Sequence, residues 1–251
     1  MSNKKYIFIL LMFTFWQILS LTDLWPHHKI PSPLEILLAL RELFIFGLPA
    51  GSNLAAHCCY SLLRVMCGFL LAVVTAIPCG IVTGWSRTLR EMLTPVIETI
   101  RPIPPLAWIP LAILWFGIGL KSAAFIIFLG CFFPIYLSTI SGVLSVDRIL
   151  IYAARTLGAK EKDILLKVLI PAATPSIYTG VRIGMGIGWM TLVAAEFTGV
   201  KSGYGLGYMI MTARDIQRPD FVIAGMATIG LVGYLLDLLL RYMESRSLRW
   251  R

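Results

Sequence analysis

Charged side chains are scarce in this sequence. Of its 251 residues, 14% are Asp, Glu, Lys or Arg and 58% are hydrophobic, whereas soluble domains carry about 25% charged residues. Apolar stretches of about 20 residues, long enough to cross the hydrocarbon core of a bilayer, recur along the chain. The composition therefore excludes an ordinary soluble domain and indicates an integral membrane protein.

Recognisable catalytic and nucleotide-binding motifs are also missing. The sequence has no H-E-x-x-H motif, no plausible Ser/His/Asp or Cys/His set and no C-x-x-C pair among its five cysteines. The three histidines, His27, His28 and His57, fall in the loop between the first two expected spans, where solvated side chains are the ordinary interpretation. No phosphate-binding loop G-x-x-x-x-G-K-[ST] occurs. A membrane enzyme is therefore disfavoured, no metal or cofactor site is expected, and ATP would have to bind another chain.

The excess of basic residues indicates orientation, not nucleic-acid binding. The formal net charge is +9, but no basic stripe marks a soluble domain. Lys and Arg gather at Lys4 and Lys5, at Arg87 and Arg90, between 148 and 167, and from Arg241 onward. Short cytoplasmic segments of membrane proteins carry such an excess. We therefore expect both termini in the cytoplasm of a multi-pass inner-membrane protein.

The apolar runs predict an all-α fold with about six transmembrane helices. The first is an uncleaved N-terminal span, because no small-residue cleavage site follows it. The third holds Pro102, Pro104, Pro105 and Pro110, which remove backbone donors, so we expect bent backbone there. The predicted spans are Tyr6–Leu24, Leu62–Trp85, a segment within Leu93–Gly119, Ser122–Leu144, Ser176–Phe197 and Phe221–Tyr242.

The loop between the fourth and fifth spans, residues 147–171, has an amphipathic helical pattern. Apolar residues recur with helical spacing in two short pieces, separated by Gly158 and Ala159. Gly158 permits a turn with positive φ or the close approach of another backbone. Pro171 is expected to end the second piece. Periodicity alone leaves three uses open: a helix on the lipid headgroups, a solvated linker, or a docking element for another protein.

The stretch AARTLGAKEKDILLKVLIPAATPSIYTGVR resembles the EAA loop of ABC-importer permeases. Ala153, Ala154, Gly158 and Pro171 match the family's spacing, whereas Tyr152 stands where the family has Glu. The resemblance implies that this loop docks a short helix into a separate ATPase subunit. The residues assigned to coupling are Tyr152, Ala153, Ala154, Gly158, Ala159, Leu169 and Pro171.

Other stretches resemble the nitrate, sulfonate, taurine and bicarbonate branch of these permeases. They are SLLRVMCGFLLAVVTAIPCGIVTGWS, RPIPPLAWIPLAILWFGIG and GVRIGMGIGWMTLVAAEFTGVKSGYGLG. The resemblance covers roughly Ser61 to Asp237 and implies a MetI-like permease core over 61–251, after an N-terminal helix and outer segment over 1–60. It also implies ABC ATPase subunits that hold ATP and Mg, a solute-binding protein and a second permease copy, which makes a homodimer.

Several residues within the spans are candidates for helix packing or the translocation pathway. Gly180, Gly184 and Gly188 recur every four residues and form a face that another helix can approach closely. Arg182 is expected to snorkel or to line the inner vestibule. Glu196 is either a pathway residue or an interfacial acid that pairs with a base such as Lys201 or Arg218.

Together these features predict the permease subunit of an ATP-driven importer for a small oxyanion or sulfonate. The alternative is a secondary transporter or channel that needs no ATPase. Such proteins usually show inverted repeats or several deep ionisable residues, and we see no such repeat in this sequence.

Overall fold

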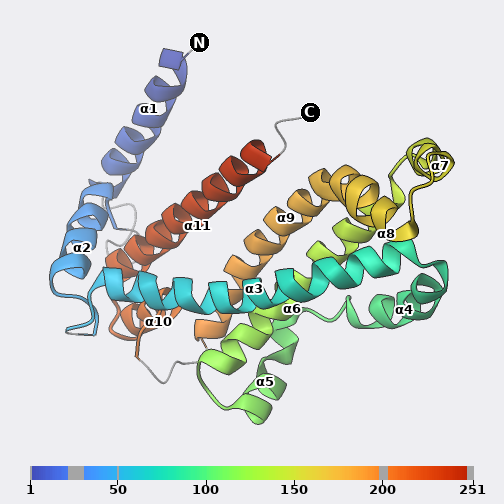
Figure 1. Ribbon diagram of the computed structural model, residues 1–251. Coiled ribbons are helices and arrows are strands. Elements are labelled where there is room, and N and C mark those ends of the chain that lie inside the picture. The colour runs from blue at the N-terminus through green and yellow to red at the C-terminus, as the bar shows by residue number, and fades with distance from the viewer. Residues whose placement is uncertain (1, 22–30, 50, 198–202, 248–251) are drawn as a thin grey trace. The chain divides into compact units, whose positions relative to one another are not determined.

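The computed structural model describes residues 2–21, 31–49, 51–197 and 203–247, and every regular element within these ranges is helical (Figure 1). The prediction of an all-α fold is confirmed. The chain folds as two compact units, each built from two separate stretches of sequence. One unit combines Met1–Leu62 with Glu196–Val232, and the other combines Leu63–Ala195 with Gly233–Arg251.

Four helices in the described part of the chain are long and apolar enough to cross a membrane. They are α3 (Leu54–Trp85), α6 (Leu120–Leu144), the continuous helix Glu161–Phe197 and α11 (Pro219–Ser247). The number rises to five if two bent segments count as one span. These are α4 (Arg87–Ile100) and the segment 105–116, made of η1 (Pro105–Trp108) and α5 (Ile109–Phe116), which together are long and apolar enough to cross a membrane. The first predicted span corresponds to α1 (Ser2–Leu21), of which only Leu10–Ser20 counts as a shorter apolar helix; the end of that predicted span, 22–24, lies outside the described residues. The described residues thus support four or five spans.

The bend expected in the third span is present. The axes of α4 and the 105–116 segment differ by 80°, and the break falls at residues 101–104. Pro102, Pro104 and Pro105 remove three helical donors within four residues, and each disfavours the helical conformation of the residue before it. Two half-length helices therefore replace one straight span.

Helix α6 is the centre of the unit formed by 63–195 and 233–251. A Cβ atom built on Gly80 or Gly84 of α3 would come within 2.7 Å of Thr139 or Val143 of α6. On its other side α6 meets the glycines of α9 (Ile170–Phe197). Both neighbours therefore approach α6 at backbone distance, which is how helices pack where lipid supplies no hydrophobic driving force between them.

The unit formed by 1–62 and 196–232 holds α1, α2 (Pro33–Ile45), α10 (Leu206–Asp215) and the adjoining ends of three long helices. Helix α2 begins with a capping box. The Ser32 hydroxyl accepts a hydrogen bond from the Glu35 N–H at 3.2 Å, and the Glu35 carboxylate accepts one from the Ser32 N–H at 2.7 Å. Pro33 occupies the first helical position, which does not need a donor.

Candidate coupling site

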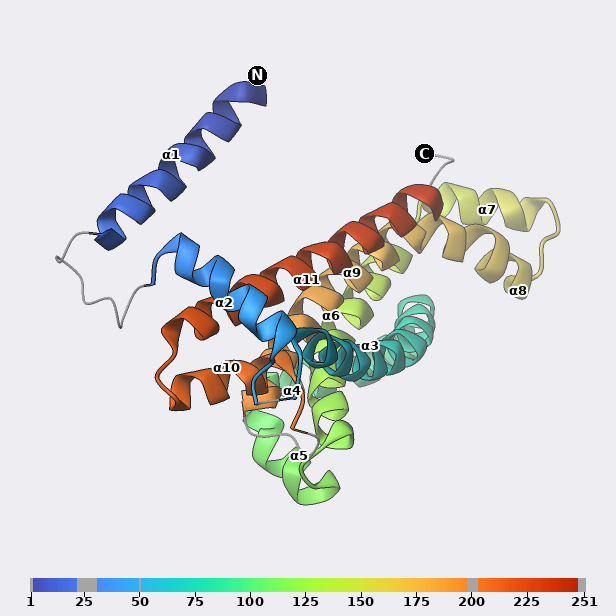
Figure 2. The same ribbon diagram turned by 90° about the vertical axis from the view of Figure 1, so that its left-hand side faces the viewer.

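The segment 147–171 folds as two short helical pieces joined by a tight turn. Helix α7 (Arg148–Thr156) begins at Asp147, whose carboxylate accepts a hydrogen bond from the Ile149 N–H at 2.8 Å. The second piece is α8 (Glu161–Ile164), which leads into η2 (Leu165–Leu169). Both views show α7 and α8 at the same end of α9 (Figures 1 and 2).

Gly158 makes the turn between the two pieces. Its φ is +79°, and a Cβ atom built there would meet nothing within 4 Å. The Gly158 N–H donates to the Arg155 carbonyl at 2.9 Å, and the Ala159 N–H donates to the Ala154 carbonyl at 3.1 Å. Such bonds satisfy the last carbonyls of a helix in the Schellman type of ending, which places Gly in the left-handed region. Two uses were expected for Gly158: a turn with positive φ, or the close approach of another backbone. The structure shows the turn with positive φ, and within the described chain no other backbone approaches Gly158 at the position of a Cβ atom.

An ion pair closes the same turn. Arg155 Nη2 lies 2.9 Å from Glu161 Oε1, and both side chains are about half exposed. A solvated pair of this kind contributes only about 0–1 kcal/mol. It holds the end of α7 beside the start of α8 without burying either one.

The expectation that Pro171 ends the second piece is wrong. Helical structure continues from Glu161 to Phe197, and Pro171 is the second residue of α9. The residues before it, 165–169, form a π-turn in which the Ile170 N–H donates to the Leu165 carbonyl, five residues back. In a regular α-helix the proline ring would clash with the carbonyl of Lys167. The wider π-turn relieves that clash, so the helix survives the proline.

The apolar residues of the two pieces have different environments. Ile164 is 0% exposed and Leu169 is 1% exposed, so the second piece is anchored in the chain's own core. Leu169 packs there with Val143, Val146 and Ala173. Leu157, by contrast, is 87% exposed and Ile149 is 71% exposed. The second piece, α8 and η2, is therefore fixed in the core, whereas α7 and the residue after it expose apolar side chains to solvent.

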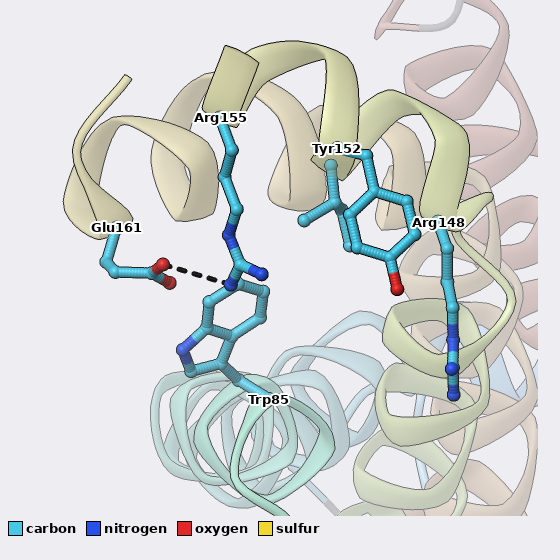
Figure 3. A pocket seen from close by; sticks show the side chains of 6 residues that line it. Trp85, Arg148, Tyr152, Arg155 and Glu161 are labelled. Carbon is cyan, nitrogen blue, oxygen red and sulfur yellow. Dashed lines mark ion pairs between the residues drawn. The ribbon is translucent and has the colours of Figure 1, made fainter. Parts of the chain in front are cut away.

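Tyr152 lines an open groove beside the turn. The groove has a volume of about 380 Å³ and is lined by Trp85, Arg148, Ile151, Tyr152, Arg155 and Glu161. Figure 3 shows Arg155 extending from α7 to Trp85 and pairing with Glu161, with Tyr152 and Arg148 to one side of them. Ala153 on the same helix is exposed, and Ala154 is half-buried. Position 152 thus contributes a phenol, not a carboxylate, to this groove.

Residues 76–249 match the family model described as "Binding-protein-dependent transport system inner membrane component". The chain belongs to this family. The permease is 53% identical over 205 residues to a putative ABC transporter permease protein of Methanocaldococcus jannaschii, which covers 82% of this chain and 76% of the relative. It is 40% identical over 242 residues to the taurine transport system permease protein TauC of Escherichia coli, which covers 95% of this chain and 86% of the relative.

A solved structure shares the fold of the permease. A chain of the MetNI methionine ABC transporter, solved in inward facing conformations, superimposes with a TM-score of 0.65 at 22% identity. The match covers 78% of the permease and 94% of the other chain. At this identity the comparison shows the fold alone, and it agrees with the expected MetI-like core.

The three glycines of the fifth span face α6 within the same permease chain. A Cβ atom on Gly184 would lie 2.8 Å from Ile135 Cγ1, and one on Gly180 would lie 3.2 Å from the Pro134 carbonyl oxygen. A Cβ atom on Gly188 would overlap Cys131 Sγ. The spacing thus serves a helix contact inside the chain.

Arg182, expected to snorkel or to line the inner vestibule, forms two ion pairs with acids of α11. Its Nε lies 3.4 Å from Asp237 Oδ1, and its Nη1 lies 3.3 Å from Glu244 Oε2, both on α11. The side chain is 39% exposed. Sequence alone did not connect these residues, because they are more than 50 positions apart.

Glu196 is 1% exposed and anchors the start of α10. It accepts hydrogen bonds from the Ser61 hydroxyl at 2.8 Å and from the Gly207 N–H at 2.9 Å. Ser61 accepts a further bond from the Leu206 N–H at 2.9 Å. Two donors at the N-terminus of α10 are therefore satisfied by side chains of α3 and α9, a favourable position for a negative charge.

Arg218, one of the two bases named as examples of a partner for Glu196, pairs with other acids. Its guanidinium binds Asp220 at 2.7 Å and Glu42 at 3.2 Å. The hydrogen bond that it donates to Asp220 raises the pKa of Arg218 above its ordinary range, so this group stays charged. The other expected partner, Lys201, lies outside the described residues.

His57 is not a solvated loop side chain. It belongs to α3, is 0% exposed, and its Nδ1 lies 2.9 Å from the Gly205 backbone nitrogen. The expectation failed because α3 begins at Leu54, eight residues before the predicted span. His27 and His28 lie outside the described residues. Within the described part of the chain, no group of three or more His, Cys, Asp or Glu residues could hold a metal ion.

Proposed function

We propose that this permease is the membrane-spanning subunit of an ATP-driven importer, and that its coupling site docks on a separate ATPase. The observation that carries the proposal is the exposed apolar end of α7. Leu157 is 87% exposed directly before the Gly158 turn. Water is a poor environment for such a side chain, and apolar side chains that project from a short helix fit a groove on a partner.

The continuous helix from Glu161 to Phe197 supports a mechanical role for this site. Ile164 and Leu169 hold the second piece in the core, and helical structure continues from Glu161 to Phe197, so a displacement of α8 would be transmitted directly to α9. Helix α7 is tied to α8 through the Gly158 turn and the Arg155–Glu161 ion pair. Helix α9 has 28 residues and is thus about 42 Å long at 1.5 Å per residue, more than the thickness of the hydrocarbon core. ATP-driven movement of the docked helix would in this way reach the opposite face of the membrane.

The cargo that we propose is a small oxyanion or sulfonate. The basis is the relative named as a taurine transport permease, which is 40% identical over 95% of this chain. A solute-binding protein would deliver the cargo from outside. ATP and Mg²⁺ would bind the ATPase subunits, and the permease itself would hold no cofactor.

A second copy of the chain would complete the pathway. One face of α9 carries Ile183, Gly186, Ile187 and Met190, all exposed in this chain. A Cβ atom on Gly186 would meet nothing within 4 Å. This small-residue apolar face is suited to the close approach of the same helix from a second permease. Both termini would face the cytoplasm, which the distribution of Lys and Arg favours.

A capture experiment tests the docking role. We expect detergent-solubilised permease to retain its ATPase, and a Leu157→Asp variant to retain at least tenfold less, because a carboxylate would enter an apolar contact. Ile216→Asp is the matched control, since Ile216 is a 50% exposed residue outside the coupling site. Equal capture by wild type and by Leu157→Asp would contradict the docking role.

A further inference from the structure

A second groove, away from the coupling site, lies between α4 and α6. Its volume is about 110 Å³. The polar lining comes from Arg90, Thr94, Glu98 and Arg101, which recur at intervals of four, four and three residues and therefore share one face of α4. Helix α6 supplies the opposite wall with Tyr136, Leu137 and Ile140, and the Tyr136 hydroxyl donates to Thr83 at 3.2 Å.

Helix α4, which lines the groove, forms one half of a candidate span that is broken at residues 101–104. Helix α4 and the 105–116 segment pass the test for a span only together, so Glu98 and Arg101 lie next to the break. Ionisable side chains at bilayer depth cost about 2.5–3.5 kcal/mol each on insertion scales, and they mark solute pathways when they are retained. None of the α4 side chains is buried, and residues 101–104 are exposed in this chain. Non-helical backbone at that depth is tolerated only where it meets water or protein.

The two charges nearest the break do not neutralise each other. Glu98 and Arg101 are three residues apart, a spacing at which opposite charges on a helix commonly pair. Arg87 and Glu91 on the same helix do pair, at 2.7 Å. Among the residues that the structure describes, neither Glu98 nor Arg101 forms an ion pair, although both line the groove. One carboxylate and one guanidinium are thus available to a bound solute.

Arg90 adds a positioned cation at the other end of the groove. Its Nη1 donates to the Gly84 carbonyl at 2.8 Å, which fixes the side chain and leaves further donors. With Arg90 and Arg101 the groove holds two guanidinium groups and one carboxylate. A plain anion would satisfy the guanidinium groups and leave Glu98 as a repulsive neighbour.

We propose that this groove is a transit site for a small zwitterion that carries both an oxyanion and an ammonium group, such as an aminosulfonate. The inference rests on the proposed import of oxyanions or sulfonates and narrows that class. The planar guanidinium of Arg101 matches a sulfonate or carboxylate oxygen pair, and Glu98 accepts from the ammonium group. Leu137 and Ile140 cover the short carbon chain between them. The groove volume of about 110 Å³ exceeds several-fold the minimum of about 10–15 Å³ that one water needs, so the groove has room for a small solute.

Direct binding to the permease tests this site without the selectivity of the binding protein. The sample is the detergent-solubilised complex of permease and ATPase, and saturation-transfer NMR measures the affinity for taurine and for ethanesulfonate, which lacks the ammonium group. We expect wild type to bind taurine more tightly than ethanesulfonate. Glu98→Gln should weaken taurine binding about tenfold and leave ethanesulfonate binding unchanged. Arg101→Gln should weaken the binding of both.

Matched controls lie on the same helix. Glu91→Gln and Arg87→Gln remove the same charges from α4 at exposed positions outside the groove, and we expect neither to change the affinity for taurine. The zwitterion site is overturned if wild type does not prefer taurine, or if Glu98→Gln weakens the binding of both solutes equally.

A second experiment distinguishes failure of the zwitterion site from failure of the proposed function. It measures import by the complete transporter in proteoliposomes. ATP-dependent uptake of taurine or ethanesulfonate, without the binding pattern above, would leave the proposed function standing and overturn the transit site alone. Absence of uptake of either solute, with all three components assembled, would overturn the proposed cargo class and the transit site together.

Discussion

Gly180, Gly184 and Gly188 of α9 have no side chain, and this allows α6 to pack closely against them. Their four-residue spacing is visible in the sequence and indicates that some helix comes close. It does not say which helix, because the same face could meet another element of the chain or a second copy. The identity of the neighbour depends on packing between residues about 50 positions apart, such as Gly188 and Cys131.

Gly188→Ala should destabilise the permease more than the same substitution at a helical glycine where no neighbour lies close to the position of a Cβ atom. The added methyl group overlaps Cys131 Sγ, and overpacking of this kind costs about 1–3 kcal/mol. Thermal unfolding in detergent should show a melting temperature lower by several degrees, and a second change, Cys131→Ala, should restore most of the loss.

Gly230→Ala is the control for this substitution. Gly230 lies within α11 and a Cβ atom there would meet nothing within 4 Å, so alanine should be neutral or stabilising by up to about 1 kcal/mol. Equal melting temperatures for the Gly188 and Gly230 variants would show that α6 does not press on Gly188.

The sequence did not predict the buried polar contacts between individual residues. Glu196 and Ser61 are 135 positions apart, and nothing in either local sequence links them. Glu196 stood out because an acid near the end of an apolar span is costly. That signal located the residue, but it could not name the Ser61 hydroxyl or the Gly207 N–H as its donors.

At the scale of elements, periodicity predicted the two pieces of the coupling segment, and proline rules failed at Pro171. The rule assumes that the preceding turn keeps i→i−4 hydrogen bonds. Five residues of π-turn, 165–169, remove that assumption, and apolar runs alone do not reveal such a turn. Helix α2 was also missed, although Ser32, Pro33 and Glu35 carry its start signal.

The anchor of α10 gives a prediction for a whole element. In Glu196→Gln the Gly207 N–H loses a charged acceptor in a buried place, which costs about 1–3 kcal/mol. We expect hydrogen exchange over residues 206–213 to quicken by about 5- to 150-fold, the range that this cost corresponds to, measured by mass spectrometry on the detergent-solubilised permease.

The control for the α10 anchor is Asp215→Asn. Asp215 is an exposed acid of the same helix whose side chain pairs only with its neighbour Arg214 in the described structure, so exchange of α10 should not change. If Glu196→Gln also leaves the exchange of α10 at its wild-type rate, Glu196 does not hold the start of that helix.

At the scale of the whole molecule, the distribution of charge and the lengths of the helices predict an orientation that can be checked. Composition and apolar length predicted a polytopic helical protein, and this was confirmed. The predicted number of six spans was not confirmed, because prolines break the third span and the first span lies partly outside the described residues. Orientation comes from the Lys and Arg of residues 148–167, which favour the cytoplasm.

Helix α9 begins at that basic segment and is long enough to cross the bilayer. The turn between α10 and α11, which includes Gln217, must then lie outside. In a cysteine-free background we expect a membrane-impermeant maleimide to label Gln217→Cys in intact cells, and to label Thr156→Cys only after the cells are permeabilised. Both positions are exposed in the structure, so a difference in labelling reports the side of the membrane and not burial. Labelling of both positions in intact cells would place the α7 segment outside, where no cytoplasmic ATPase could reach it, and would remove the coupling role together with the orientation.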